Sequence, residues 1–109
     1  MAKIEYVLKG DFDQTLRLIE EGILNGSRTA SLEDSSDFQM GSARCSVRVF
    51  ERYSIFGANR VSLNVTLFQN GTEDIYLSGI TSGGSQAVAY KINTVGEEAF
   101  LEKLKEILE

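Results

Sequence analysis

The stretch 61-VSLNVTLFQNGTEDIYLSGI-80 decides the fold class, because it holds two alternating segments joined by a turn. Apolar residues recur at every second position on both sides of the turn, which is the pattern of strands with one buried face. A three-residue loop over 69–71, with a left-handed Gly71, would place Val65 opposite Ile75. A two-residue loop would place apolar residues opposite polar ones, since a one-residue slip exchanges the two faces of a strand. The sequence therefore predicts an antiparallel hairpin with the longer loop.

The next segment, 79-GITSGGSQAVAYKINTVGEEAF-100, extends this antiparallel meander. A two-residue turn at Gly83-Gly84 would place Leu77 opposite Tyr90, so that the apolar faces match. This pairing predicts a sixth strand over 85–92. A phosphate loop would need its glycines to lead directly into a helix, with Lys-Ser/Thr or a third glycine at fixed spacing, and that pattern is absent. We therefore interpret the glycine pair as a hairpin turn.

Two amphipathic helices flank the meander. The first follows a strand over 3–9, begins with Asp11 as N-cap and ends at Asn25-Gly26. The second begins with Thr94 as N-cap and Glu97 three residues later. Each helix carries an apolar stripe at helical spacing, which in the first consists of Phe12, Leu16, Ile19 and Ile23.

The middle of the chain predicts two further strands. One covers Ser27 to Leu32, followed by a polar segment, 33–43, that is either a loop or a strand extension with Phe38 and Met40 pointing inward. The other has an alternating pattern that places three residues on the inward face: Cys45, Val47 and Val49. We expect Cys45 to be a buried structural cysteine.

The predicted order is β-α-β-β-β-β-β-α within one domain, 1–109, whose length allows a single core. One apolar sheet face must be covered by the two helices. The fold class is therefore α+β, a two-layer sandwich in which an N-terminal and a C-terminal helix cover a curved antiparallel sheet. The expected core consists of Leu63, Val65, Leu67, Ile75, Leu77, Val88, Tyr90, Leu104 and Ile107.

Composition narrows the function classes. The formal charge of −5 disfavours nucleic-acid binding, which needs a basic surface. There is no apolar run of membrane-spanning length and no secretory signal, so we expect a cytoplasmic protein with no membrane partner. The chain has no histidine and a single cysteine, so the commonest general base and metal ligand are missing. We expect no metal, no cofactor and no enzymatic activity; an enzyme would have to use Tyr53, Tyr90 or a carboxylate.

Two resemblances add to this interpretation. Gly83-Gly84-Ser85, a strand, Asn93-Thr94 and a helix after Gly96-Glu97 resemble the end of the helix-grip fold of START domains and pollen-allergen relatives. The predicted order would fit a helix-grip-like or a TBP-like arrangement. The whole chain is similar to a family of short, uncharacterised proteins of Gram-positive bacteria, through the pattern GGSQA-KINT-GEEAFL. That resemblance implies no activity.

Three candidate sites follow from these patterns. A ligand pocket between the sheet and the C-terminal helix would be lined by Tyr6, Tyr90, Phe100 and Leu104. A homodimer would form through outward-facing apolar residues of the sheet: Phe50, Phe68, Tyr76 and Ile80. We expect the basic residues of the outward face to be solvated surface charges. The alternative is an anion site made by Arg44, Arg48, Arg52 and Lys91.

The specific function is unknown at this stage. We favour a non-catalytic binding or interaction module of a bacterial cytoplasm, because catalytic groups are scarce while the scaffold is complete. The alternative is a carrier of a small apolar ligand, held in the pocket between the sheet and the C-terminal helix.

Overall fold

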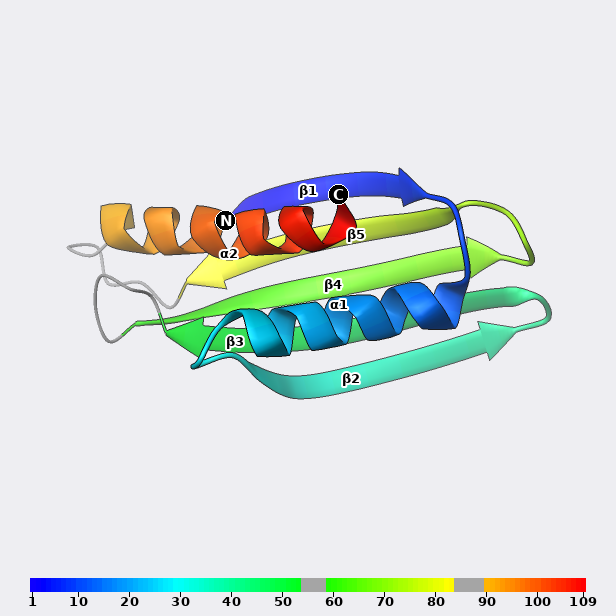
Figure 1. Ribbon diagram of the computed structural model, residues 1–109, viewed down its shortest axis with the longest axis horizontal. Helices are drawn as coiled ribbons and strands as arrows, with labels where there is room; N and C mark the ends of the chain where they lie inside the picture. The colour runs from blue at the N-terminus through cyan, green and yellow to red at the C-terminus, as the bar shows by residue number, and fades with distance from the viewer. Residues whose placement is uncertain (54–58, 84–89) are drawn as a thin grey trace.

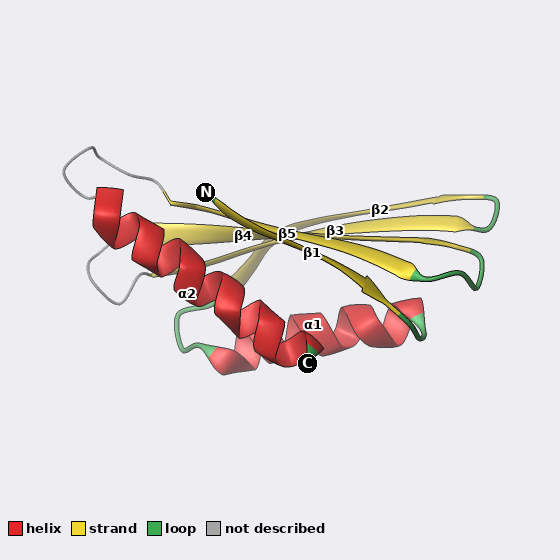
Figure 2. Cartoon of the chain, turned by 90° about the horizontal axis from the view of Figure 1, so that it is seen from above, coloured by secondary structure: helices red, strands yellow, loops and turns green. Residues whose placement is uncertain are grey.

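The computed structural model describes residues 1–53, 59–83 and 90–109, and side chains from residue 96 onward in the last segment. Within these residues, five strands form one antiparallel sheet in the order β1-β5-β4-β3-β2. Both helices pack on the same side of the sheet, and Figure 2 shows no helix or strand of the described residues on the opposite side. The elements are β1 (Ala2–Leu8), α1 (Phe12–Gly26), β2 (Ser31–Met40), β3 (Ala43–Tyr53), β4 (Arg60–Asn70), β5 (Ile75–Gly83) and α2 (Tyr90–Leu108) (Figure 1).

The predicted fold class is confirmed: an α+β sandwich with one N-terminal and one C-terminal helix. The predicted sixth strand is wrong over Tyr90 to Ile92, because α2 already begins at Tyr90. Thr94 consequently lies inside this helix and is not its N-cap. The Gly83-Gly84 turn and the strand residues 85–89 lie outside the described residues, apart from Gly83, which ends β5.

Helix α1 forms as its sequence predicts. The Asp11 side chain accepts a hydrogen bond from the Gln14 backbone N–H at 2.8 Å, which caps the first turn. The apolar stripe faces the sheet and is buried along its whole length, in Phe12, Leu16, Ile19 and Ile23. Of the predicted core, the described residues of β4, β5 and α2 are buried or packed against it: Leu63, Val65, Leu67, Ile75, Leu77, Leu104 and Ile107.

The β4–β5 register differs from the prediction. Leu67 pairs with Leu77, and Val65 pairs with Gly79 rather than with Ile75. The connection is longer because the Glu73 N–H bonds to the Asn70 carbonyl. A displacement by an even number of residues leaves each side chain on the same face of its strand, so the buried set is unchanged.

The β2–β3 hairpin corrects the prediction for the middle of the chain. Residues 33–40 belong to β2, so of the two alternatives for this segment the strand extension is the correct one. The strand begins at Ser31 and not at Ser27 as predicted. Phe38 and Met40 were expected to point inward, but they are 69% and 83% exposed. The chain reverses through Gly41, whose φ of 60° lies in the left-handed region that favours glycine.

Close contacts join α2 to the rest of the molecule. The carboxylate of Glu97, which is 6% exposed, accepts a hydrogen bond from the Gly83 N–H at 2.6 Å and pairs with the N-terminal ammonium at 2.9 Å. A Cβ on Gly22 of α1 would lie 2.6 Å from the Ile107 side chain, so glycine allows the two helices to approach closely. In the described part of the chain, no helix is both long and apolar enough to cross a membrane.

Candidate functional site

The basic residues of β3 face the helices. Arg48 pairs in register with the buried Val65 and is itself only 8% exposed. The same alternation places Arg44 and Arg52 on this side of the sheet. The sequence-based prediction of an outward-facing basic group is therefore wrong for these arginines.

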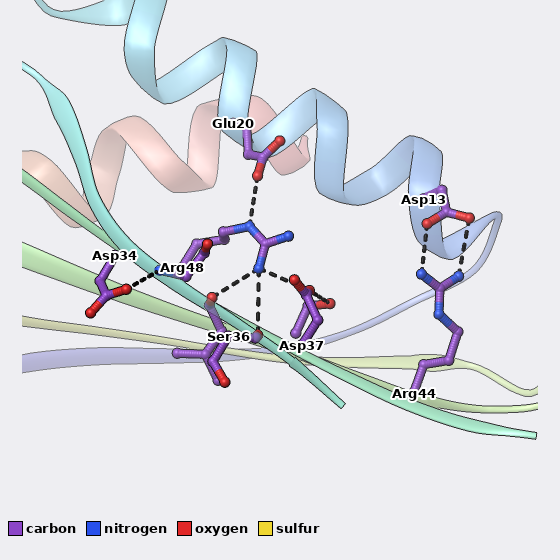
Figure 3. Close-up of polar contacts among 10 residues, drawn as sticks. Asp13, Glu20, Asp34, Ser36, Asp37, Arg44 and Arg48 are labelled. Atoms are coloured by element: carbon purple, nitrogen blue, oxygen red, sulfur yellow. Dashed lines mark hydrogen bonds and ion pairs between the residues drawn. The ribbon is translucent and has the colours of Figure 1, made fainter. Parts of the chain in front are cut away.

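The guanidinium of Arg48 bonds to its neighbours through Nε and Nη1 (Figure 3). Its Nε donates to Glu20 Oε2 of α1 at 2.7 Å, and its Nη1 donates to Asp37 Oδ1 at 2.9 Å and to the Val47 carbonyl at 2.9 Å. Burial alone would lower the pKa of Arg48, but the hydrogen bonds that it donates to Glu20 and Asp37, with the charges of these carboxylates, outweigh burial and raise that pKa. A hydrogen bond from Ser46, followed by that from Arg48, lowers the pKa of Asp37. Arg48, Glu20 and Asp37 therefore form a structural clamp between the sheet and α1.

The other arginines of this row are occupied in the same way. Arg44 forms a two-pronged pair with Asp13, at 2.7 and 3.0 Å, and lies over the Phe12 ring (Figure 3). This hydrogen-bonded pairing lowers the pKa of Asp13. Arg52 lies 4.5 Å from the ring centre of Phe100, and burial lowers its pKa. The side chain of Lys91, the fourth residue of the predicted anion site, lies outside the described residues.

The side of the sheet opposite the helices carries an apolar row that crosses every strand. Each member pairs in register with the next one on the neighbouring strand. The row runs from β1 to β2 as Val7, Tyr76, Phe68, Cys45 and Phe38. We call this side of the sheet the bare face, and these five residues the apolar row.

The rows next to the apolar row are mostly small or polar. One consists of Glu5, Ser78, Thr66, Val47 and Ser36, and the next of Lys3, Ile80, Asn64, Val49 and Asp34. Charges in these two rows lie only on the edge strands, β1 and β2. In these rows the bare face thus has an uncharged centre and a charged rim, which is the usual composition of a protein interface. Beyond them, at one end of the sheet, Glu51 of β3 and Arg60 of β4 lie on the same side and form an ion pair.

The surface of the bare face is hollowed along the apolar row. A depression of about 420 Å³ lies against Val7, Phe68, Tyr76 and Thr66. A second, of about 160 Å³, is lined by residues of β2, β3 and β4 that include Phe38, Cys45 and Phe68. Both are open to solvent and mainly apolar, so they suit side chains of a binding partner.

The residues predicted for a dimer face separate into two groups. Phe68, Tyr76 and Ile80 lie together on the bare face and are 43%, 58% and 38% exposed. Phe50 is wrong for this set, because it pairs with Leu63 on the helix side and is fully buried. Its large ring fills the core between β3 and the helices.

Other members of the bare face were not predicted as such: Val7, Phe38, Met40 and Cys45. Cys45 was assigned to the core, but it is half-buried on the bare face beside Phe68. The available signal was Phe50, since placing its large apolar ring in the core forces Cys45 to the opposite side of the strand.

Three of the four residues predicted for a ligand pocket have side chains that the structure describes. Phe100 and Leu104 are fully buried in the core. Tyr6 is half-buried on β1, and its hydroxyl donates to Glu109 at 3.4 Å. The side chain of Tyr90 lies outside the described residues. Among the residues that the structure describes, no three acidic, cysteine or histidine side chains are grouped to hold a metal.

The described residues define a small α+β protein whose two helices cover one face of the sheet and leave the other face without a helix. The model of a family of unknown function, DUF6054, matches residues 1–109, and the chain belongs to this family. Neither a curated protein nor a solved structure matches the chain.

Proposed function

We propose that the protein is a non-catalytic interaction module of a bacterial cytoplasm, and that its bare face binds another protein surface. The apolar row carries this proposal: Val7, Phe38, Phe68 and Tyr76 are between 43% and 69% exposed. Single exposed apolar side chains are normal, whereas a contiguous group across five strands marks an interaction surface. Aromatic residues are also the side chains that most often dominate binding energy at protein interfaces.

The charges of the bare face favour a protein partner over a nucleic acid. Glu5 and Asp34 lie on opposite edge strands of this face, and Lys3 is the basic residue of the same rows. A nucleic-acid surface needs several basic groups to replace counterions, and the carboxylates would repel its phosphates. An uncharged aromatic centre instead suits an apolar protein surface.

A carrier of a small apolar ligand has less support. Its pocket would lie between the sheet and α2, where Leu104 is fully buried. A Cβ on Gly79 of β5 would lie only 2.7 Å from Leu104 Cδ2, so side chains already fill this part of the layer.

Native mass spectrometry of the purified protein tests the proposal. We expect masses of the chain alone and of its complexes with protein, and no retained small molecule. Phe68→Glu should remove the protein complexes, because it places an unpaired charge in the centre of the apolar row. Leu18→Glu is the matched control, since Leu18 is 53% exposed on α1. An added mass of small-molecule size that is lost on denaturation would contradict the module and favour the carrier.

A further inference from the structure

The strand order gives the bare face a central strand. β4 has β5 and β1 on one side and β3 and β2 on the other. If two copies met face to face about a twofold axis parallel to β4, β4 would face β4, β5 would face β3, and β1 would face β2. Every strand would then have a partner strand, and sheets packed face to face with aligned strands lie about 10 Å apart.

The apolar row is complementary to itself under this operation. Phe68 would face Phe68 of the second copy, since it lies on the central strand. The large Tyr76 would face the small Cys45, because they occupy the strands on either side of β4. Val7 on one edge would face Phe38 on the other. Large side chains would thus meet smaller ones except at the axis, which allows close packing.

The charges are complementary under the same operation. Lys3 and Asp34 lie at opposite ends of one register row, linked through Ile80, Asn64 and Val49. The axis would set Lys3 of each copy against Asp34 of the other, so that two opposite-charge pairs form at the rim. Glu5 would face Ser36, so no like charges would meet in these rows.

A twofold axis perpendicular to the strands, along the apolar row, satisfies fewer of these conditions. It would set Tyr76 against Tyr76 and Phe38 against Phe38. Because the apolar row lies near the ends of β1 and β2, the rows of Thr66 and Asn64 would face turns or solvent. The axis parallel to β4 pairs all three of these rows with rows of the second copy.

The size of the bare face is compatible with a dimer. Neighbouring strands lie about 4.8 Å apart, and successive residues of a strand lie about 3.4 Å apart. Five strands of seven residues therefore have a projected area on the order of 550 Å². A stable interface buries about 800 Å² of accessible surface per partner. Because a side-chain surface has more accessible area than its projection, the bare face reaches this range.

From these relations we infer that the occupant of the bare face is a second copy of this chain, related by a twofold axis parallel to β4. The inference rests on the proposed function, because it names the partner of the same surface. The dimer is a sandwich of two sheets with a helical layer on each outer side.

Single-cysteine cross-linking tests this geometry. Thr66 lies in the middle strand and the middle row, so in Cys45→Ser/Thr66→Cys the two thiols face each other across the dimer. In the wild-type dimer, the Cys45 residues of the two copies lie on opposite sides of the axis. They are therefore separated sideways by two strand spacings, about 10 Å, in addition to the distance between the sheets. With a bis-maleimide that spans about 8 Å, we expect the variant to give at least fivefold more covalent dimer than the wild type.

The charge pairs provide a second readout in the same variant. Lys3→Asp should lower the cross-linked yield severalfold, and Lys3→Asp with Asp34→Lys should restore it, since the swap recreates the opposite-charge pairs. Cross-linking through Cys45 of the wild type in preference to Thr66→Cys would contradict the axis. An absence of cross-linking from both proteins, with a monomer in sedimentation, would overturn the second copy as occupant. Both results leave the proposed function standing, because that function is contradicted by a retained small molecule in native mass spectrometry.

Discussion

The guanidinium of Arg48 and the carboxylate of Glu20 join the sheet to α1, with Nε 2.7 Å from Oε2. Asp37 of β2 holds the same guanidinium from the side at 2.9 Å. A charged side chain can remain beneath a helix when opposite charges and hydrogen bonds replace the lost water. The clamp therefore holds α1 on the side of the sheet opposite the bare face.

Glu20→Gln should weaken this clamp. Because it removes a charge-assisted hydrogen bond to a nearly buried guanidinium, we expect the free energy of unfolding to fall by about 1–2 kcal/mol. Glu21→Gln, on the exposed side of the same helix, should change it by less than about 0.5 kcal/mol. Urea denaturation at pH 7 measures both values. Equal effects of the two variants would show that the Arg48 contact contributes nothing specific.

The acid side of the stability profile should depend on Asp37. Hydrogen bonds from Ser46 and Arg48 lower the pKa of this carboxyl in the folded state. A lowered folded pKa contributes stability that is present above the unfolded pKa of about 3.9 and is lost as pH falls through the folded value. Asp37→Asn should thus be less stable than wild type at pH 7, and the difference should shrink toward pH 2. A difference in urea midpoint that stays constant with pH would refute this linkage.

Gly79→Ala should strain the contact between β5 and α2. The new Cβ would lie 2.7 Å from Leu104 Cδ2 and 3.3 Å from Ile4 Cγ1. Since Leu104 is fully buried, it has little room to move, and overpacking of this kind costs about 1–3 kcal/mol. Ser78→Ala, on the opposite face of β5, is the control. Thermal unfolding should also show that Leu104→Val relieves part of the loss, because neighbouring substitutions are not additive.

The sequence predicts the positions of most helices and strands better than it predicts which face of each strand is buried. Helix α1 follows from its cap at Asp11 and its apolar stripe, both of which are local signals. The two strands of the β4–β5 hairpin follow from alternation, but their register does not, because a four-residue displacement preserves the faces. The start of α2 at Tyr90 was missed because 85–92 has an equally good strand pattern.

The candidate surface could be predicted only in part. Phe68, Tyr76 and Ile80 were found because β4 and β5 have one clearly apolar and buried face. In β3 both faces carry apolar residues, so alternation alone could not orient the strand. Arg48 favoured the wrong orientation, with Cys45, Val47 and Val49 in the core, because a charged side chain is normally expected on the surface. Only the tertiary partners on α1 and β2 explain why it is inside.

Sedimentation velocity over a range of micromolar concentrations tests the central claim most directly. The wild type and Leu18→Glu should both show a concentration-dependent dimer, whereas Phe68→Glu should remain a monomer with an unchanged fold by circular dichroism. The reason is that a carboxylate at Phe68 would meet its own copy at the axis in an apolar interface. A wild-type monomer at every concentration, or a dimer that Phe68→Glu leaves intact, would contradict assembly through the bare face.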